Sequence, residues 1–399
     1  MDKIVSESKK CRVETGSFPI ALKSGDGCYF FDTEGKKYLD FNSNFSTNNV
    51  GYGRPEIKRV IEEHAKSGLY KIDGTTYYTD EALKLAKKLL GISPENMSKV
   101  LFINSGAEAV ENAIKFVYLK RRGGQPGISC KGAFHGRTLG ALTYTESKAV
   151  QKQYFPQLPS HVIEFCTSDD DKQIGELEEY IRMEGAPAFV IVEAVQGEGG
   201  YRPAGKKFLQ TIRKVTRENN IPLIIDEVQS GMGRTGKWWA HEHYGIKPDI
   251  MTAAKSLCVG ATLVSKKYDN NEPGSIGSTW GGGHLIDLAV GLKVIEIIEK
   301  EKLMKNAERM GTYFLKRLGE LAEKYPIKDV RGLGLMIGFD LQKEGDNKKV
   351  VNEALKNGLA LLTCGYKGIR IAPPLIITEE DAEKGLGILE ESLKAVSAV

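Results

Sequence analysis

Hydrophobic positions are distributed along the middle of the chain in two alternating patterns. Short apolar runs, suited to strands buried on both faces, are separated by longer segments with a helical pattern. The expected strands cover residues 100–103, 188–195, 222–226 and 249–254, and the expected helices cover 81–90, 107–120 and 208–218. Apolar strands that alternate with helices predict a mostly parallel sheet covered on both faces. The pattern therefore predicts an α/β fold.

The two ends of the chain have a different pattern. Turn signals at residues 24–27 and 33–36 flank aromatic and apolar runs, which predicts a small antiparallel sheet. From about residue 288 a long helix is expected to lead into a strand at 334–341. A second strand is expected at 368–371, and a closing helix is expected after Thr378.

We therefore expect two domains. Residues 52–287 form a large domain around the central sheet. Residues 1–51 and 288–399 form a smaller α/β domain, in which the N-terminal segment shares a sheet with the C-terminal part.

Composition excludes several classes of function. The net charge of +4 is spread along 399 residues without a basic run, so no nucleic-acid partner is expected. Six cysteines without a C-x-x-C pair, and with no histidine cluster nearby, predict neither disulfides nor a metal site. No apolar stretch is long enough to span a membrane, and the N-terminus lacks the apolar core of a signal peptide. We expect no membrane partner and a cytoplasmic location.

A candidate phosphate site follows the first expected strand of the large domain. Ser105, with Glu108 three residues later, forms a capping-box pattern at the start of a helix. Gly106 would allow a ligand to approach the backbone closely. The free N–H groups and the dipole of a helix N-terminus favour a phosphate. An ordinary well-capped helix would show the same residues.

Two charged residues lie at the carboxyl ends of expected strands. Asp226 ends the apolar run at 223–226, and Lys255 directly follows the run at 250–254. Open α/β sheets bind ligands at this edge. Partial burial would lower the pKa of the lysine amine and make it a usable nucleophile. A phosphate cradle, a strand-end aspartate and a strand-end lysine together are what pyridoxal phosphate requires.

A nucleotide-binding alternative rests on residues 231–237, GMGRTGK, which match both G-x-x-x-x-G-K and G-x-G-x-x-G. A P-loop needs Ser or Thr after its lysine, but Trp238 stands there, and the acidic strand precedes the loop instead of following it. A dinucleotide-binding loop should open a helix directly after its strand. We treat both matches as coincidences.

Several motifs, in order, resemble those of the class III aminotransferases, the family of the ornithine, 4-aminobutyrate, acetylornithine and lysine 6-aminotransferases. They are SGAEAVENAIK, AFHGRT, VEAVQGEGGY, IIDEVQSGMGRTG, PDIMTAAKSL and GSTWGGG. The resemblance extends from the hairpin near Tyr29 to the C-terminal helix. It implies a fold type I pyridoxal-phosphate-dependent transferase that acts as a homodimer.

The resemblance also implies roles for individual residues. Lys255 would hold the cofactor covalently and shuttle the proton, and Asp226 would pair with the pyridine nitrogen. Phe134 would stack on the ring, Gln229 would bond its phenolic oxygen, and His135 and Glu193 would complete the cofactor pocket. The phosphate would be held by Ser105, Gly106, Ala107 and, from the neighbouring subunit, Thr279.

The resemblance implies that two substrates share the site. Arg370 would grip the α-carboxylate of glutamate or 2-oxoglutarate, and Glu198 would mask Arg370 while the ω-amine donor is bound. Arg137 would take the donor's remote carboxylate or the γ-carboxylate of glutamate. A structural ion pair is the alternative for both arginines.

The donor is ranked on two features. The segment KSLCVGATLVSKK after Lys255 is short and looks closest to the lysine 6-aminotransferases. Phe45 stands where the ornithine enzymes have a tyrosine, and loss of that hydroxyl removes a polar partner for the substrate. We therefore expect lysine first, 4-aminobutyrate second, and ornithine or acetylornithine third. An amino-acid racemase is a weaker alternative, because a gated glutamate site favours transamination.

Overall fold

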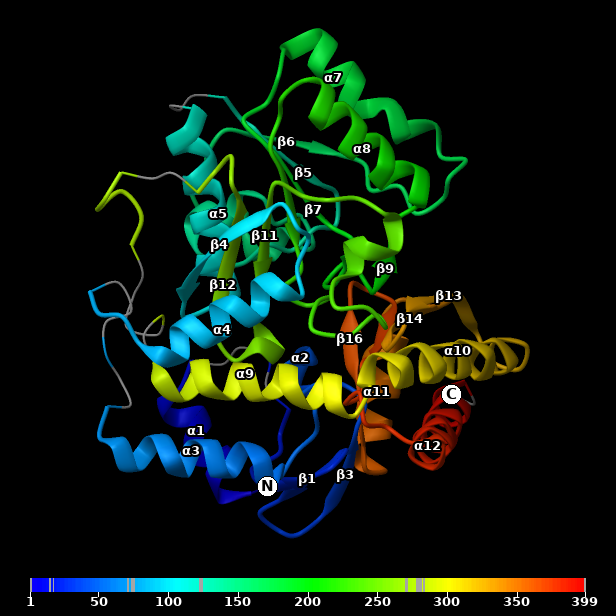
Figure 1. Cartoon of the computed structure of the whole chain (residues 1–399). Coiled ribbons are helices and arrows are strands. Elements are labelled where there is room, and N and C mark those ends of the chain that lie inside the picture. Colours follow the sequence, from blue (N-terminus) through cyan, green and yellow to red (C-terminus); the bar gives the residue numbers. More distant parts are fainter. Residues whose placement is uncertain are drawn as a thin grey trace.

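The fold is built around one large sheet, with smaller sheets beside it (Figure 1). The computed structural model describes residues 2–13, 16, 18–69, 72, 76–121, 125–269, 272–277, 282 and 284–397. The large sheet has seven strands in the order β4-β12-β11-β10-β7-β5-β6. Their bounds are β4 Met97–Ile103, β5 Gly127–Cys130, β6 Ser160–Ile163, β7 Val190–Glu193, β10 Leu223–Asp226, β11 Ile250–Ala253 and β12 Gly260–Ser265.

Six of these strands share one direction, and β12 runs antiparallel to both of its neighbours, β11 and β4. The prediction of a mostly parallel sheet is confirmed. The strand expected at 188–195 is divided, because its end forms β8 (Val195–Gln196), which pairs with β9 (Arg202–Pro203) in a separate two-stranded sheet.

Helices cover both faces of the large sheet. Ile191 and Ile224 pack with apolar residues of α5 (Gly106–Arg121). Their neighbours along the strands point the other way, into a cluster with α8 (Lys206–Glu218). This alternation of side chains explains why the strands are apolar throughout. The edge near β4 is covered by α4 (Asp80–Gly91), which packs against α9 (Leu285–Lys300).

The smaller sheets combine distant parts of the chain. The strands β1 (Leu22–Asp26), β2 (Tyr29–Asp32) and β3 (Lys37–Asp40) form the expected antiparallel sheet, and β15 (Leu359–Ala360) extends it parallel to β3. A second four-stranded sheet has the order β13-β14-β17-β16. Its strands are β13 Ile327–Leu333, β14 Met336–Leu341, β16 Leu362–Cys364 and β17 Gly368–Ile371. The domain boundaries at residues 51/52 and 287/288 stay a prediction.

The remaining helices lie around these sheets. They are α1 Lys3–Cys11, α2 Ser43–Ser46, α3 Pro55–Ser67, α6 Leu139–Thr143, α7 Glu176–Glu184, α10 Leu303–Ala322, α11 Asp346–Lys356 and α12 Glu379–Ser397. Among the described residues, the short 3-10 helices include η1 Ala149–Gln151, η2 Lys172–Gly175, η3 Ala240–Tyr244 and η4 Lys255–Leu257. The closing helix starts where the sequence predicts it. The long helix expected from residue 288 is instead two helices, because Lys302 adopts a left-handed conformation (φ 55°) between α9 and α10.

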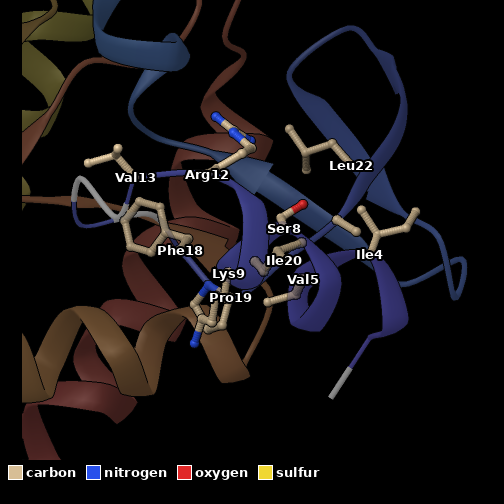
Figure 2. Close-up of a pocket in the computed structure, with 11 residues that line it drawn as sticks. Ile4, Val5, Ser8, Lys9, Arg12, Val13, Phe18, Pro19, Ile20 and Leu22 are labelled. Carbon is tan, nitrogen blue, oxygen red and sulfur yellow. The ribbon is translucent and has the colours of Figure 1, made fainter.

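Helix α1 was not expected from the sequence, since only Val5 of its nine residues is buried. Asp2 caps it by accepting a hydrogen bond from the Ile4 N–H. Together with residues 12–13 and the segment 18–22 it lines a pocket that has both polar and apolar walls (Figure 2). In the part of the chain that the structure describes, no helix is both long and apolar enough to cross a bilayer. Within the same residues, no group of three or more His, Cys, Asp or Glu side chains is arranged to hold a metal ion.

Candidate active site

The carboxyl ends of three neighbouring strands meet at one edge of the large sheet. Glu193 ends β7, Asp226 ends β10, and Lys255 follows β11 by two residues. Asp226 is in register with Glu193 on one side and with Thr252 on the other. The parallel register therefore gathers these charged side chains into one place, as the sequence predicts.

These side chains line a pocket of about 490 Å³, a volume suited to a cofactor. Most of the predicted cofactor residues lie on its wall, together with Arg137. The lining includes Ser105, Gly106, Ala107, Phe134, His135, Arg137, Glu193, Asp226, Gln229 and Lys255. Thr279, predicted to come from the neighbouring subunit, lies outside the described residues.

Asp226 is held rigidly at the base of the pocket. Its Oδ1 accepts hydrogen bonds from the Val228 N–H (3.0 Å) and the Thr252 hydroxyl (3.1 Å), and its Oδ2 lies 2.8 Å from Nδ1 of His135. His135 is itself buried, and its Nε2 has no hydrogen-bond partner among the described groups. A carboxylate fixed in this way suits an ion pair with a protonated ring nitrogen of a ligand.

Lys255 combines a strained backbone with a side-chain amine whose pKa is lowered. Its φ is 50°, in the left-handed region that a lysine rarely adopts, and such strain is common at functional sites. Burial, followed by the positive charge of Arg370, lowers the pKa of the amine to about 8. Roughly one-tenth of the amine is therefore neutral and nucleophilic at pH 7, a far larger fraction than for a surface lysine.

Glu193 joins two loops of the pocket. Its Oε2 accepts a hydrogen bond from the Phe134 N–H (2.9 Å), and its Oε1 accepts one from the Gly197 N–H (2.8 Å). Burial raises the pKa of its carboxyl group to about 7, although the charge of His135 opposes the shift. The position of the Phe134 ring and that of the loop after residue 196 are thus coupled through one carboxylate.

The start of α5 forms a cradle beside these groups. Ser105 and Glu108 make the predicted capping box, in which the Glu108 N–H donates to the Ser105 hydroxyl (3.3 Å) and the Ser105 N–H donates to Glu108 (3.0 Å). A Cβ on Gly106 would lie 2.7 Å from Cγ1 of Val228, so only glycine fits there. The helix N-terminus, the fixed Asp226 carboxylate and the Lys255 amine together fit a phosphorylated pyridine aldehyde.

A buried ion pair lies beyond the pocket lining. Nη1 of Arg370 donates to Oε1 of Glu198 at 2.7 Å, and only 2% of Arg370 is exposed. Burial alone would raise the pKa of the Glu198 carboxyl group, but the charge of Arg370 and its hydrogen bond lower it overall. The Arg370 guanidinium carbon lies 5.9 Å from the ring centre of Phe45 and 5.4 Å from that of Tyr201.

Glu198 also faces a second cation. Its Oε2 lies 3.7 Å from the amine of Lys148, which is about one-third exposed. Lys148 and Arg137 line a common hollow beside the pocket. The Arg137 side chain is exposed, and its guanidinium carbon lies 6.0 Å from the ring centre of Phe134.

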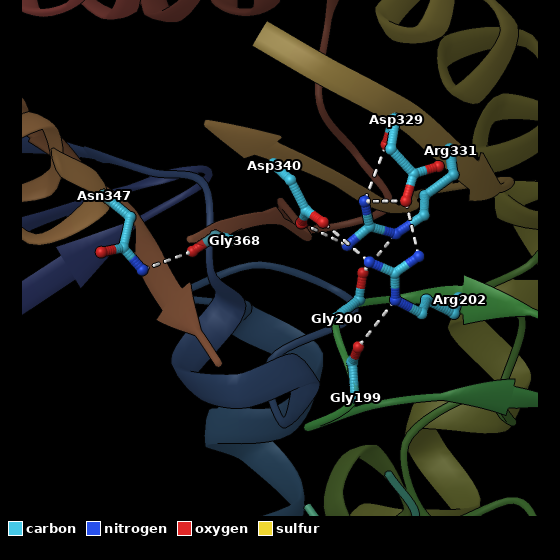
Figure 3. Close-up of polar contacts among 8 residues, drawn as sticks. All are labelled: Gly199, Gly200, Arg202, Asp329, Arg331, Asp340, Asn347 and Gly368. Atoms are coloured by element: carbon cyan, nitrogen blue, oxygen red, sulfur yellow. Dashed lines mark hydrogen bonds and ion pairs between the residues drawn. The ribbon is translucent and has the colours of Figure 1, made fainter. Parts of the chain in front are cut away.

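Two arginines hold the backbone directly after Glu198 (Figure 3). Nε of Arg202 donates to the carbonyl of Gly199 (3.2 Å), and Nε of Arg331 donates to that of Gly200 (3.0 Å). Both guanidinium groups also bind the same two carboxylates, and we call this group the arginine clamp: Arg202, Arg331, Asp329 and Asp340. Asp340 lies on β14, which pairs with β17, the strand of Arg370. The clamp therefore fixes the Glu198 loop to the sheet that carries Arg370.

The nucleotide-binding interpretation of residues 231–237 is wrong. All of these residues are described, and they form turns that no α-helix follows. Arg234, within this segment, is fully buried and donates hydrogen bonds to Leu335 O (3.1 Å) and Asn49 Oδ1 (2.5 Å). The segment is thus a structural junction between the large sheet and the two ends of the chain.

Sequence reasoning did not identify the second cation at Glu198, the arginine clamp or Tyr201. Tyr201 is the last residue of the family motif VEAVQGEGGY, directly after Gly199 and Gly200. Its hydroxyl accepts a hydrogen bond from Nε2 of Gln229 (3.0 Å). That position was a usable signal. Arg331 begins the stretch RGLGLM, which also resembles the family, but nothing in that stretch indicates its contact with Gly200. Lys148 lies in no such motif, so the sequence holds no comparable signal for it.

Comparison with known proteins agrees with this geometry. The family model described as aminotransferase class-III matches residues 11–393. The acetylornithine aminotransferase of Archaeoglobus fulgidus is 38% identical over 98% of this chain and 100% of its own. That of Methanocaldococcus jannaschii is 38% identical over 94% of each chain.

Solved structures give the same family. Lysine aminotransferase from M. tuberculosis superposes with a TM-score of 0.91 at 25% identity, over 98% of this chain and 99% of its own. Ornithine aminotransferase from Toxoplasma gondii does so with a TM-score of 0.89 at 26% identity, over 99% of this chain and 95% of its own. The predicted fold type I architecture is confirmed, and the enzymes of this family use pyridoxal phosphate. The chain belongs to the class III pyridoxal-phosphate-dependent aminotransferases.

Proposed function

We propose that the enzyme transfers the distal amino group of a small amino acid to 2-oxoglutarate, and that N-acetylornithine is its preferred donor. The observation that carries this proposal is the buried Glu198–Arg370 ion pair beside the pocket that contains Lys255. A site that must accept two substrates of different charge needs a carboxylate-binding arginine whose charge can be masked.

Bound pyridoxal phosphate supplies an electron sink. Lys255, whose amine has a pKa near 8, would hold the cofactor covalently and, once released by the substrate, would move the proton at the substrate carbon. Asp226 would keep the pyridine nitrogen protonated, Phe134 would lie against the ring, and Gln229 would bind the phenolic oxygen. Ser105, Gly106 and Ala107 would hold the phosphate, together with Thr279 of a second subunit.

The ion pair distinguishes the two half-reactions. Glutamate places its α-carboxylate on Arg370, which must first be released from Glu198. The ω-amine donor has no carboxylate next to the reacting amine, so Arg370 stays paired while Arg137 takes the remote carboxylate. The contact between Nη1 of Arg370 and Oε1 of Glu198, at 2.7 Å, corresponds to the masked arrangement.

The choice of donor rests on charge. Lysine and ornithine carry a free α-ammonium, whereas N-acetylornithine carries a neutral amide. The hollow beside the pocket already presents two cations, Arg137 and Lys148. Phe45, near Arg370, offers no hydroxyl for an ammonium group. The acetylornithine aminotransferases among the relatives support the same ranking, which replaces the preference for lysine drawn from the sequence.

Single-turnover spectra of the cofactor-loaded enzyme test the donor. We expect N-acetylornithine to convert the cofactor to its amine form at least about tenfold more efficiently than lysine, ornithine or 4-aminobutyrate. A factor of this size is typical when a poorer substrate leaves one polar group without a partner in the site. Phe45→Tyr should reduce the difference in conversion efficiency between N-acetylornithine and ornithine, since it supplies a hydroxyl as a polar partner for the ornithine ammonium group. Faster conversion by lysine would reject this donor and support the likeness to lysine aminotransferase.

Glu198→Ala tests the gate. It leaves Arg370 permanently unmasked, so it should impair the ω-amine half-reaction more than the glutamate half-reaction. Equal losses in both would reject the gate. Inversion of an amino acid's chirality without any keto acid present would instead indicate a racemase.

A further inference from the structure

Glu198 lies between two cations, and each of its carboxylate oxygens faces a different one. Oε1 binds Nη1 of Arg370 at 2.7 Å, and Oε2 lies 3.7 Å from Nζ of Lys148. The two cations differ in environment, because Arg370 is fully buried and Lys148 is about one-third exposed. The carboxylate is thus already shared, with the closer contact on Arg370.

The backbone next to Glu198 has little freedom to move. The Gly197 N–H binds Glu193, and the arginine clamp holds the carbonyls of Gly199 and Gly200 (Figure 3). Gly200 has φ 108°, and a Cβ there would lie 2.7 Å from Nη2 of Arg331, so the loop is packed tightly against the clamp. A change of partner at Glu198 is therefore confined to rotation of its side chain.

Release of Arg370 would leave a mostly buried carboxylate without a counter-charge. Only 17% of the Glu198 side chain is exposed, and an unpaired charge in such a place costs several kcal/mol. Although burial raises the pKa of the Glu198 carboxyl group, Arg370, Lys148 and Lys255 together lower it, so the group is ionised at neutral pH. Among the described residues, Lys148 is the cation besides Arg370 that forms an ion pair with this carboxylate.

We propose that Lys148 is a positioning residue that receives the Glu198 carboxylate when a dicarboxylate substrate occupies Arg370. Lys148 thereby stabilises the unmasked state, which only glutamate and 2-oxoglutarate need. The inference rests on the gate in the proposed function. It adds a second, defined position for Glu198 and a residue that no family motif contains.

Lys148→Met is the direct test. In the cofactor-loaded enzyme we expect this substitution to raise KM for glutamate and 2-oxoglutarate roughly five- to tenfold, a typical size for one coupled charge pair. Calorimetric binding of glutarate, an unreactive dicarboxylate, should weaken by a similar factor. The half-reaction with N-acetylornithine, whose α-amide is neutral, should change less than about twofold, and Lys148→Arg should restore dicarboxylate binding because it keeps the charge.

Lys152→Met is the matched control. Lys152 follows η1 on the same segment, and it pairs with Glu146 instead of Glu198. Its replacement should leave glutarate binding unchanged. Unchanged glutarate binding in Lys148→Met, or equal losses in both half-reactions, would overturn the inference.

The double variant separates this role from direct substrate binding. In the Glu198→Ala background, Lys148→Met should have no further effect on glutarate binding, because there is no carboxylate left to receive. Additive losses would mean that Lys148 binds the substrate itself, and the inference would be wrong. If Glu198→Ala is selective for the ω-amine half-reaction but Lys148→Met is silent, the gate stands and only the role of Lys148 fails. If Glu198→Ala is not selective, both fail.

Discussion

At Lys255, burial and the charge of Arg370 lower the pKa of the amine to about 8, so its reactivity should follow pH in a distinctive way. In cofactor-free protein, acylation of Lys255 by acetic anhydride should be half-maximal near pH 8. Lysines on the surface should become reactive only near their usual pKa of about 10.4. Peptide mapping across a pH series measures both. A Lys255 profile that coincides with the surface lysines would contradict the proposed desolvation.

The same shift has a consequence for stability. Between about pH 8 and about pH 10.4, the unfolded chain binds more protons at this position than the folded chain. The contribution of Lys255 to the free energy of unfolding of the cofactor-free protein therefore rises with pH across that window. Below pH 8 the folded protein carries a buried charge, and the favourable contribution is absent.

At the scale of single residues, the sequence predicts those site residues whose place is set by the end of a strand or by a family motif. Lys255 and Asp226 were identified because parallel strands place their carboxyl ends at one edge, whatever the details of packing. Lys148 and the arginine clamp were not, because the partners that define them are distant in sequence: Glu198 for Lys148, Asp329 and Asp340 for Arg202, and Gly200 for Arg331. Such contacts depend on tertiary packing, which residue types and spacing do not encode.

At the scale of elements, the least expected feature is α2, where four successive residues are left-handed. Ser43, Asn44, Phe45 and Ser46 have φ between 46° and 64°, although none is glycine. Each such residue costs roughly 1–2 kcal/mol, so surrounding contacts must hold the turn. The Ser43 hydroxyl donates to Ala372 O at 2.5 Å, and Asp40 accepts the Ser43 N–H at 2.9 Å. The turn presents Phe45 to Arg370, which explains why strain is tolerated here.

Asn44 allows this strain to be measured. Its side chain is exposed, so Asn44→Gly and Asn44→Ala remove similar contacts but differ in left-handed freedom. We expect the glycine variant to exceed the alanine variant by about 1 kcal/mol in free energy of unfolding. Urea denaturation of the two proteins gives the difference. An alanine variant as stable as the glycine variant would mean that the turn relaxes.

Elements with strong periodicity were predicted well, and others were missed for physical reasons. The strand β12 has the sequence GATLVS, with small residues and no flanking signal, and it is stabilised by pairing with β11 and β4. Helix α1 exposes most of its residues and lacks an apolar face large enough to be recognised. In both cases neighbouring structure, not local sequence, determines the element.

At the scale of the whole molecule, an exposed apolar surface supports the expected homodimer. Residues after α6 present Val150, Tyr154 and Phe155 to solvent, and Tyr154 is 87% exposed. Exposed apolar side chains that cluster in this way favour a protein interface. We expect sedimentation velocity to give a dimer of two 44.0 kDa chains, and Tyr154→Asp with Phe155→Asp to shift it toward monomer. A wild-type monomer with full activity would contradict the expectation that a second subunit completes the site.

The pairing of β3 with β15 has a consequence for how the chain is made. The Leu39 N–H donates to Gly358 O at 2.8 Å, and the Phe41 N–H donates to Ala360 O at 3.0 Å. The strand β3 therefore cannot complete its pairing until β15 has been synthesised. At translation rates of about 5–20 residues per second, roughly 16 to 64 s separate the synthesis of the two strands. During that interval the nascent chain presents an open strand edge, the surface that chaperones protect and that aggregation exploits. A protein interrupted before residue 358 would never close that edge, so premature termination should yield aggregates, not a shortened enzyme.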